Sequence, residues 1–102
     1  MPLAFDDDRA ALYTVGQVAG MLEVQPSFLR RLDTEQVVQP ARSGGGQRRY
    51  SRIDIARVQQ VTRLADEGLS LAGIRRVLAL EAEVAALHAE IAALRASSGA
   101  PA

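Results

Sequence analysis

The sequence of 102 residues predicts a mainly α-helical protein: a winged helix-turn-helix domain with a two-stranded wing, followed by a C-terminal helix that dimerises as a short coiled coil. Three observations predict this fold. Two short amphipathic segments follow each other with a tight connection, a glycine run separates two strand-like segments, and a heptad repeat of aliphatic residues lies near the end. A chain of this size holds one small domain and an appendage.

The first two predicted helices form the helix-turn-helix. Apolar residues recur at helical spacing from residue 15 to residue 22, directly after Thr14, which is a good N-cap residue, and this helix is expected to end near Glu23. A second helix is expected to begin near Pro26, because a missing N–H is harmless in a first helical turn. Such a pair with a tight connection is typical of a helix-turn-helix, whose second helix enters the major groove of DNA.

The segment from residue 37 to residue 50 predicts the wing. Val37-Val38 and Arg48–Tyr50 can each form a brief strand, with Pro40 and the glycines 44–46 between them. Arginines flank the glycines, so the hairpin can press flexible backbone and guanidinium groups against a phosphate strand. The glycine run lacks the Gly-Lys-Ser/Thr ending and the preceding parallel strand of a nucleotide-binding loop.

Two more helices complete the predicted domain. Ser51 followed by Asp54 resembles a capping box, and an apolar stripe from residue 53 to residue 65 predicts the third helix. Gly68 stands where a left-handed residue ends a helix, and Ser70 can cap a fourth helix with apolar residues up to position 78. We assign these stripes to the core.

The last predicted helix carries a dimerisation seam. Its aliphatic residues alternate three and four positions apart, which is the spacing of a coiled coil. Residues 77–95 would form a helix of roughly 28 Å, which is marginal in water unless it pairs. The alternative is one more amphipathic helix that folds back onto its own domain. The seam consists of Val77, Leu80, Val84, Leu87, Ile91 and Leu94.

The chain therefore divides into four predicted parts: a disordered acidic arm (1–12), the helix-turn-helix head (13–76), the coiled-coil helix (77–96) and a disordered tail (97–102). No apolar run approaches the roughly 20 residues that cross a bilayer. The N-terminus is acidic where a signal peptide needs positive charge. We expect a cytoplasmic, nucleoid-associated protein with no membrane partner.

The charge distribution favours a nucleic-acid partner although the net charge is zero. All 12 basic residues are arginine, and ten of them lie between residues 30 and 76, where only five acidic residues occur. The guanidinium group is a planar fork suited to phosphates and to guanine edges. A genomic preference for arginine codons would explain arginine over lysine but not this concentration. We therefore expect double-stranded DNA as a partner.

Composition argues against enzymatic and metal chemistry. The chain has no cysteine and one histidine, which excludes a disulfide scaffold, an iron–sulfur cluster and a thiolate metal site. His88 has no partner ligands in its vicinity along the sequence. No acid pair with supporting residues suggests catalysis. The sequence thus predicts no enzyme, no cofactor and no metal site.

Three strings in the sequence resemble the MerR family of bacterial transcription regulators, and within it the HspR-like heat-shock repressors of actinobacteria. They are LRRLDTEQVVQP, SGGGQRRYS and DEGLSLAGIRRVL, which start at residues 29, 43 and 66. The resemblance implies that each head binds half of an inverted repeat and that the C-terminal helices pair antiparallel. It implies a phosphate-contacting role for Arg30 in the recognition helix and for the Arg48 and Tyr50 side chains in the wing.

The pairing direction of the coil stays open. In a parallel pair, Glu90 would face Arg95 of the partner subunit and Glu83 would face His88 of the partner subunit, which are favourable combinations. An antiparallel pair brings glutamates together. Exposed ion pairs contribute only about 0.2–1 kcal/mol, so we favour the antiparallel arrangement that the resemblance implies.

The residues expected to face DNA lie at the start of the first helix, on the second helix and in the wing. Those proposed to reach base edges are Gln25, Ser27 and Arg31. The remaining expected DNA-binding residues are Thr14, Gln17, Arg30, Arg42, Gly45, Gly46, Gln47, Arg48, Arg49 and Tyr50.

The sequence predicts a homodimeric DNA-binding repressor with an inverted-repeat operator, acting in a stress or heat-shock response. Its partners would be DNA, a second copy of the chain and a regulatory protein such as a chaperone. The alternative is an architectural or co-regulatory module that polymerises on repeated sites or acts with a partner protein. A symmetric protected site would favour the first hypothesis.

Overall fold

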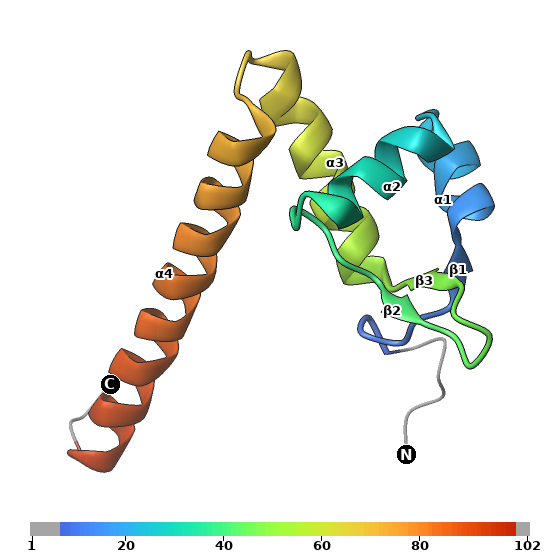
Figure 1. Ribbon diagram of the computed structural model, residues 1–102. Coiled ribbons are helices and arrows are strands. Elements are labelled where there is room, and N and C mark those ends of the chain that lie inside the picture. The colour runs from blue at the N-terminus through green and yellow to red at the C-terminus, as the bar shows by residue number, and fades with distance from the viewer. Residues whose placement is uncertain (1–6, 100–102) are drawn as a thin grey trace.

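The computed structural model describes residues 7–99, which form a helical head and a long C-terminal helix that extends away from it (Figure 1). The head contains the helices α1 to α3 and a small three-stranded sheet. In chain order the elements are β1 (Tyr13–Thr14), α1 (Val15–Leu22), α2 (Pro26–Thr34), β2 (Ala41–Arg42), β3 (Arg48–Tyr50), α3 (Arg52–Asp66) and α4 (Leu71–Ser97). The predicted mainly α-helical winged helix-turn-helix is confirmed.

The helix-turn-helix forms as its capping residues predict. Thr14 Oγ1 accepts a hydrogen bond from Gln17 N at 3.1 Å, and Gln17 Oε1 accepts one from Thr14 N at 2.8 Å. The helix ends at Glu23, which takes the left-handed conformation. Pro26 begins α2 because its missing N–H is not needed there. α1 and α2 therefore meet across a turn of three residues, 23–25.

In the wing, the predicted strand Arg48–Tyr50 is confirmed as β3, whereas its partner strand and the number of strands differ from the prediction. Val37-Val38 is not a strand, because the N–H groups of both valines donate to Leu32 O, at 2.8 and 3.2 Å. They close the turn after α2 and are buried in the core. The strand that pairs with β3 is instead β2, and β1 adds a third strand on the other side, in the order β1-β3-β2 with antiparallel neighbours.

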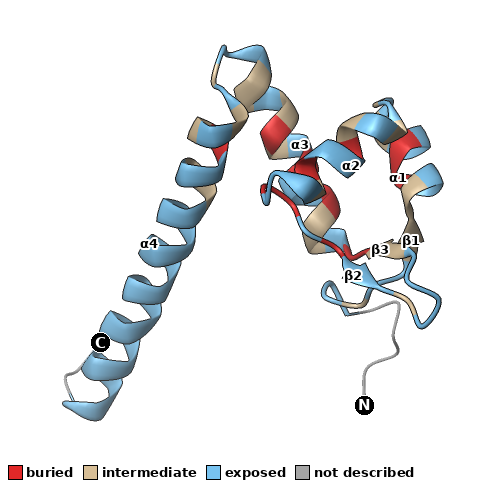
Figure 2. Ribbon diagram, viewed as in Figure 1, coloured by how far each residue is buried: buried red, intermediate tan, exposed pale blue. Residues whose placement is uncertain are grey.

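The core lies where the three head helices meet the sheet. Figure 2 shows the buried residues in red on α1, α2, α3 and β3, whereas α4 is exposed along nearly its whole length. The largest fully buried side chains are Tyr50, Leu29, Leu32, Ile74, Val18, Val58 and Val61. Ile74 is the one α4 residue in this set, so only the first turns of α4 are anchored to the head.

The start of α3, the turn after it and the start of α4 match their predicted signals. Ser51 and Asp54 form the reciprocal capping box at 3.0 and 2.9 Å. Gly68 has φ +98°, a left-handed conformation that glycine adopts without strain. Ser70 Oγ accepts from Gly73 N at 3.1 Å and caps α4.

The predicted fourth helix and the predicted coiled-coil helix are one element. α4 runs without interruption over 27 residues, about 40 Å at 1.5 Å per residue. No breaker residue separates the two parts, so the helix that begins in the core continues into solvent as a rigid rod. The seam is thereby fixed in orientation relative to the head.

The predicted arm is attached to the head where it is described. Asp8 O accepts from Ile53 N at 3.2 Å, and Leu12 N donates to Tyr50 O at 3.1 Å. Asp8 also lies 3.6 Å from an Arg52 nitrogen. Residues 7–12 have no regular secondary structure but hydrogen-bond to the end of β3 and the start of α3, so this part of the arm is attached to the head.

The rest of the predicted arm (1–6) lies outside the described residues. Of the predicted tail, Ser97 belongs to α4, 98–99 form a turn and 100–102 lie outside the described residues. No helix within residues 7–99 is long and apolar enough to span a bilayer.

Candidate nucleic-acid interface

Helix α2 presents a polar face to solvent and an apolar face to the core. Leu29 and Leu32 are buried, and both anchor the helix on the head. The residues predicted to contact DNA from this helix are exposed: Gln25, Ser27, Arg30 and Arg31. Arg31 lies in an exposed ion pair with Glu35, one turn further along the helix. The face that a major groove would meet is thus free of core side chains.

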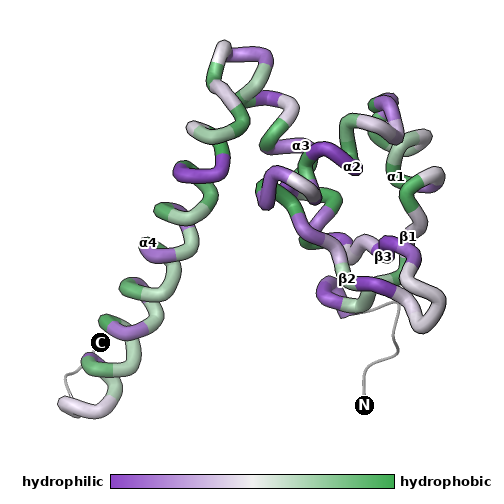
Figure 3. Tube along the Cα trace, viewed as in Figure 1, coloured by the Kyte–Doolittle hydropathy of each residue, from purple (hydrophilic) through white to green (hydrophobic). Residues whose placement is uncertain are grey.

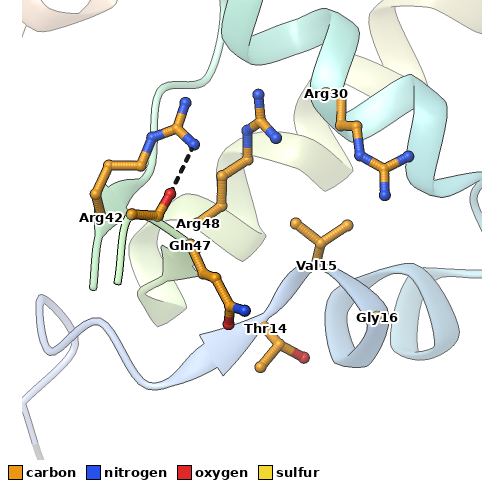
Figure 4. Close-up of a pocket in the computed structure, with 8 residues that line it drawn as sticks. Thr14, Val15, Gly16, Arg30, Arg42, Gln47 and Arg48 are labelled. Carbon is orange, nitrogen blue, oxygen red and sulfur yellow. Dashed lines mark hydrogen bonds between the residues drawn. The ribbon is translucent and has the colours of Figure 1, made fainter. Parts of the chain in front are cut away.

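A groove of about 340 Å³ lies between α2, the start of α1 and the wing. It is lined by Thr14, Val15, Gly16, Arg30, Arg42, Gly46, Gln47 and Arg48, which we call the arginine groove. Figure 4 shows Arg30 reaching from α2 toward Val15, while Arg42 and Arg48 come from the strands of the wing. Three guanidinium groups from separate elements therefore line one concave surface, which favours anions such as DNA phosphates.

Asp33 joins the end of α2 to both wing strands. Its Oδ2 accepts from Arg48 Nε at 2.6 Å and from Arg42 Nη2 at 3.0 Å. Arg42 Nη1 also donates to Gly46 O at 3.2 Å, which ties β2 to the wing tip. In the sequence, Asp33 is one of five acidic residues between residues 30 and 76, and nothing there assigns it to the wing. The one feature of the sequence that could have indicated this contact is an acidic residue one turn after Arg30, within the segment where the arginines concentrate.

The wing tip is a closed turn rather than a loose glycine loop. Ser43 N donates to Gln47 O at 2.7 Å, and Gly46 N donates to Ser43 O at 2.9 Å. Gly46 has φ +82°, which a residue with a side chain rarely adopts. Gly45 and Gln47 are exposed on this turn. The backbone that would approach a phosphate strand is therefore held in one conformation.

The Tyr50 ring packs in the core, and the geometry gives no support for the phosphate contact predicted for its hydroxyl. Its ring and hydroxyl are buried, and Oη has no hydrogen-bond partner among the described residues. Burial raises the pKa of the Tyr50 hydroxyl; the Asp33 and Asp54 carboxylates act in the same direction, and Arg48 and Arg42 oppose them. Tyr50 belongs to the core, and its hydroxyl does not reach the surface that would meet DNA.

Of the other residues predicted to bind DNA, Thr14 lines the groove, whereas Gln17 and Arg49 do not. Thr14 lines the groove, and its side-chain oxygen caps α1 together with Gln17. Arg49 is flanked by Arg48 and Tyr50 on β3, and successive side chains of a strand point to opposite faces. Arg49 therefore stands on the opposite face of the sheet from Arg48 and does not line the groove.

The predicted seam forms a continuous exposed stripe on α4. Val77 is half-buried, and Leu80, Val84, Leu87, Ile91 and Leu94 are exposed. Figure 3 shows hydrophobic segments recurring along α4 between hydrophilic ones. The upper part of the stripe borders a shallow hollow of about 400 Å³ lined by Val77, Leu80, Glu81, Val84, Ala85 and His88. The helix does not fold back onto its own head, which argues against the alternative raised by the sequence.

The fold and the arginine groove define a DNA-binding protein of the winged helix-turn-helix class. Residues 13–81 match the sequence profile of the MerR HTH family regulatory proteins. The chain belongs to this family and is a DNA-binding transcriptional regulator rather than an enzyme.

Relatives with curated descriptions agree with this assignment. The chain is 41% identical over 75 residues to the heat shock protein HspR of Streptomyces coelicolor, covering 72% of this chain and 50% of that protein. It is 32% identical over 72 residues to the HTH-type transcriptional regulator MlrA of Escherichia coli, covering 70% of this chain and 30% of that protein. The chain thus spans half or less of the length of these two relatives.

Solved structures show the same fold. The N-terminal part of MtaN, the multidrug transporter activator of Bacillus subtilis, superposes with a TM-score of 0.62 at 26% identity, over 85% of this chain and 92% of that one. A MerR-family regulator from Bacillus cereus gives the same TM-score at 22% identity, over 85% and 69% of the two chains.

Proposed function

We propose that the protein is a homodimeric transcriptional repressor that binds an inverted-repeat operator in a stress or heat-shock response. The exposed seam on α4 is the observation that carries the proposal. The same helix packs into the head through Ile74, so the seam has a fixed orientation relative to the head. Leaving five large aliphatic side chains in water is unfavourable, and pairing with a second copy removes them from it.

A dimer built on this seam presents two heads related by a two-fold axis. Such symmetry matches a DNA site whose two halves are inverted copies. In each half, the exposed residues of α2 would meet base edges in the major groove. Arg30 and the wing would contact DNA phosphates, because they line the two sides of the arginine groove.

The stress-response assignment rests on the similarity to HspR. The family profile matches residues 13–81, which are the head and the first turns of α4, and these parts would read and hold the operator. Repression is the role that the resemblance to heat-shock repressors supports. We also propose that a regulatory protein such as a chaperone binds this protein. The part of α4 beyond the head is exposed and could contact such a partner.

Selection of binding sites from a random duplex library, followed by footprinting and light scattering, tests the proposal. We expect an inverted repeat, a symmetric protected region and a mass of two chains per site. A single unrepeated half-site would contradict the dimer. Protection that lengthens with protein concentration would instead support the architectural, polymerising module. Reporter expression from a promoter carrying the selected site should fall when the protein is supplied.

A further inference from the structure

One carboxylate oxygen holds two wing arginines against the recognition helix. Asp33 Oδ2 lies 2.6 Å from Arg48 Nε and 3.0 Å from Arg42 Nη2. The Asp33 side chain is only 11% exposed, whereas that of Arg48 is 19% and that of Arg42 is 50% exposed. The contact is therefore largely screened from water on the acid side, where ion pairs are stronger than on an open surface.

The same donors are the ones that a phosphate would use. Arg42 and Arg48 line the arginine groove with Arg30, so a phosphate there would compete with Asp33 for their N–H groups. While Asp33 holds them, their charge is partly neutralised and their position is fixed relative to α2. Guanidinium groups released from this pair would be free to follow any phosphate backbone, whatever its base sequence.

We propose that Asp33 is a positioning residue that sets DNA specificity. It locks the wing to the recognition helix, so the wing contacts phosphates only where α2 is seated on its own base pairs. It also lowers the affinity for unrelated DNA by withholding positive charge. This inference rests on the proposed placement of DNA against α2 and the arginine groove.

The test compares Asp33→Asn with the wild type on a selected duplex and on a scrambled one. We expect affinity for the scrambled duplex to rise about threefold to tenfold, with a salt slope steeper by about one phosphate contact. Affinity for the selected duplex should rise less or fall, so discrimination decreases at least threefold. Asp33→Glu, which keeps the charge, should restore most of the discrimination.

Glu35→Gln is the matched control. It removes one negative charge from the end of the same helix and frees Arg31, but leaves the wing contact intact. If Glu35→Gln reduces discrimination as much as Asp33→Asn, loss of a negative charge at the end of α2 or release of Arg31 explains the effect, and the proposal is overturned. An unchanged ratio in Asp33→Asn overturns it as well.

Loss of Asp33 leaves Arg48 partly buried and unpaired, which can unfold the head. Thermal unfolding of the variant reveals this. If the variant unfolds, the comparison uses the single variant Arg48→Gln and the double variant Asp33→Asn/Arg48→Gln instead. Neither of them leaves Arg48 as an unpaired cation, and the double variant differs from the single one by the release of Arg42 from Asp33. The double variant should bind the scrambled duplex more tightly than Arg48→Gln alone, and equal binding contradicts the inference. A wild type that does not discriminate between duplexes would contradict the proposed function instead.

Discussion

Leu87 and Ile91 lie one helical turn apart on α4, and the two residues remain 57% and 44% exposed. Side chains at this spacing share a face of a helix and can enter one interface together. They lie well beyond Ile74, the last fully buried residue within 7–99. In the proposed dimer this pair contributes to assembly, so its removal should affect assembly rather than folding of the head.

Leu87→Asp should dissociate the dimer. The substitution places a charge in an apolar interface, which is costly without a partner. Light scattering should report a monomer, and operator affinity should fall about a hundredfold or more because the two half-sites no longer act together. Ala89→Asp adds the same charge on the opposite side of α4 and should remain dimeric. A dimeric Leu87→Asp variant would place the contact elsewhere.

Arg30→Ala should weaken binding to all duplexes. Arg30 is exposed on the recognition helix and lines the groove, with no ion pair found for it among the described residues. Loss of one phosphate contact should flatten the slope of log affinity against log salt by about 0.9. The control Arg63→Ala removes an exposed arginine from α3, outside the groove, and should leave the slope unchanged. An unaltered slope in Arg30→Ala would remove this residue from the interface.

Local signals predicted the helices well, because caps and breakers act over a few residues. Thr14, Ser51, Gly68 and Ser70 mark boundaries that the structure reproduces. The sequence predicts two helices where α4 is one, because the seam that starts at Val77 has the pattern of a separate coiled-coil element. Nothing in the local sequence ends the helix at residue 77.

Long-range contacts were the part that the sequence could not specify. β1 is only two residues long and exists by pairing with Tyr50 and Arg49, far away in the chain. Val37-Val38 satisfied a strand pattern, but the left-handed Gln36 turns both N–H groups back to Leu32. The candidate site shows the same limit. The exposed residues of α2 could be predicted from local pattern, whereas the burial of the Tyr50 hydroxyl and the Asp33 contact depend on tertiary structure.

Tyr50→Phe should leave DNA binding intact. The hydroxyl is buried without a partner among the described residues, so its removal should be neutral or stabilise the fold by up to about 1 kcal/mol in denaturant unfolding. Loss of operator affinity with unchanged stability would show that the hydroxyl does reach a phosphate in the complex.

The same hydroxyl makes folding sensitive to alkali. Burial raises the pKa of Tyr50 above its ordinary value of 10.0, so the unfolded chain releases this proton at a lower pH than the folded chain does. The corresponding contribution to stability is complete below pH 10.0 and is lost as pH rises through the folded-state pKa. Tyr50→Phe should therefore lose less stability above pH 10.0 than the wild type, measured by chemical unfolding at each pH.

The same glycine-to-alanine change should have opposite effects at two positions. Gly68→Ala puts a side chain at φ +98°, and should cost about 1–2 kcal/mol although no atom crowds the site. Gly20→Ala lies inside α1 with open space around it, and should stabilise by about 0.5–1 kcal/mol. Thermal unfolding of both variants measures this difference. Equal effects would contradict the left-handed turn before α4.

Operator occupancy should fall on heating through dissociation of the dimer. The seam is short, with six aliphatic residues per chain, and every residue of α4 from 79 to 97 is exposed in the single chain. Because assembly is coupled to concentration, a tenfold increase in protein should raise the midpoint temperature of operator release. Fluorescence anisotropy on a labelled operator at several protein concentrations measures this shift, with enough protein to saturate the site at low temperature.

Leu87→Asp serves as the control. A monomer should show a midpoint temperature whose concentration dependence follows single-site binding alone. A wild-type midpoint no more concentration-dependent than that of the control would show that the seam is not the temperature-sensitive element. Heat would then have to act on the head, and thermal unfolding of the free protein should coincide with release.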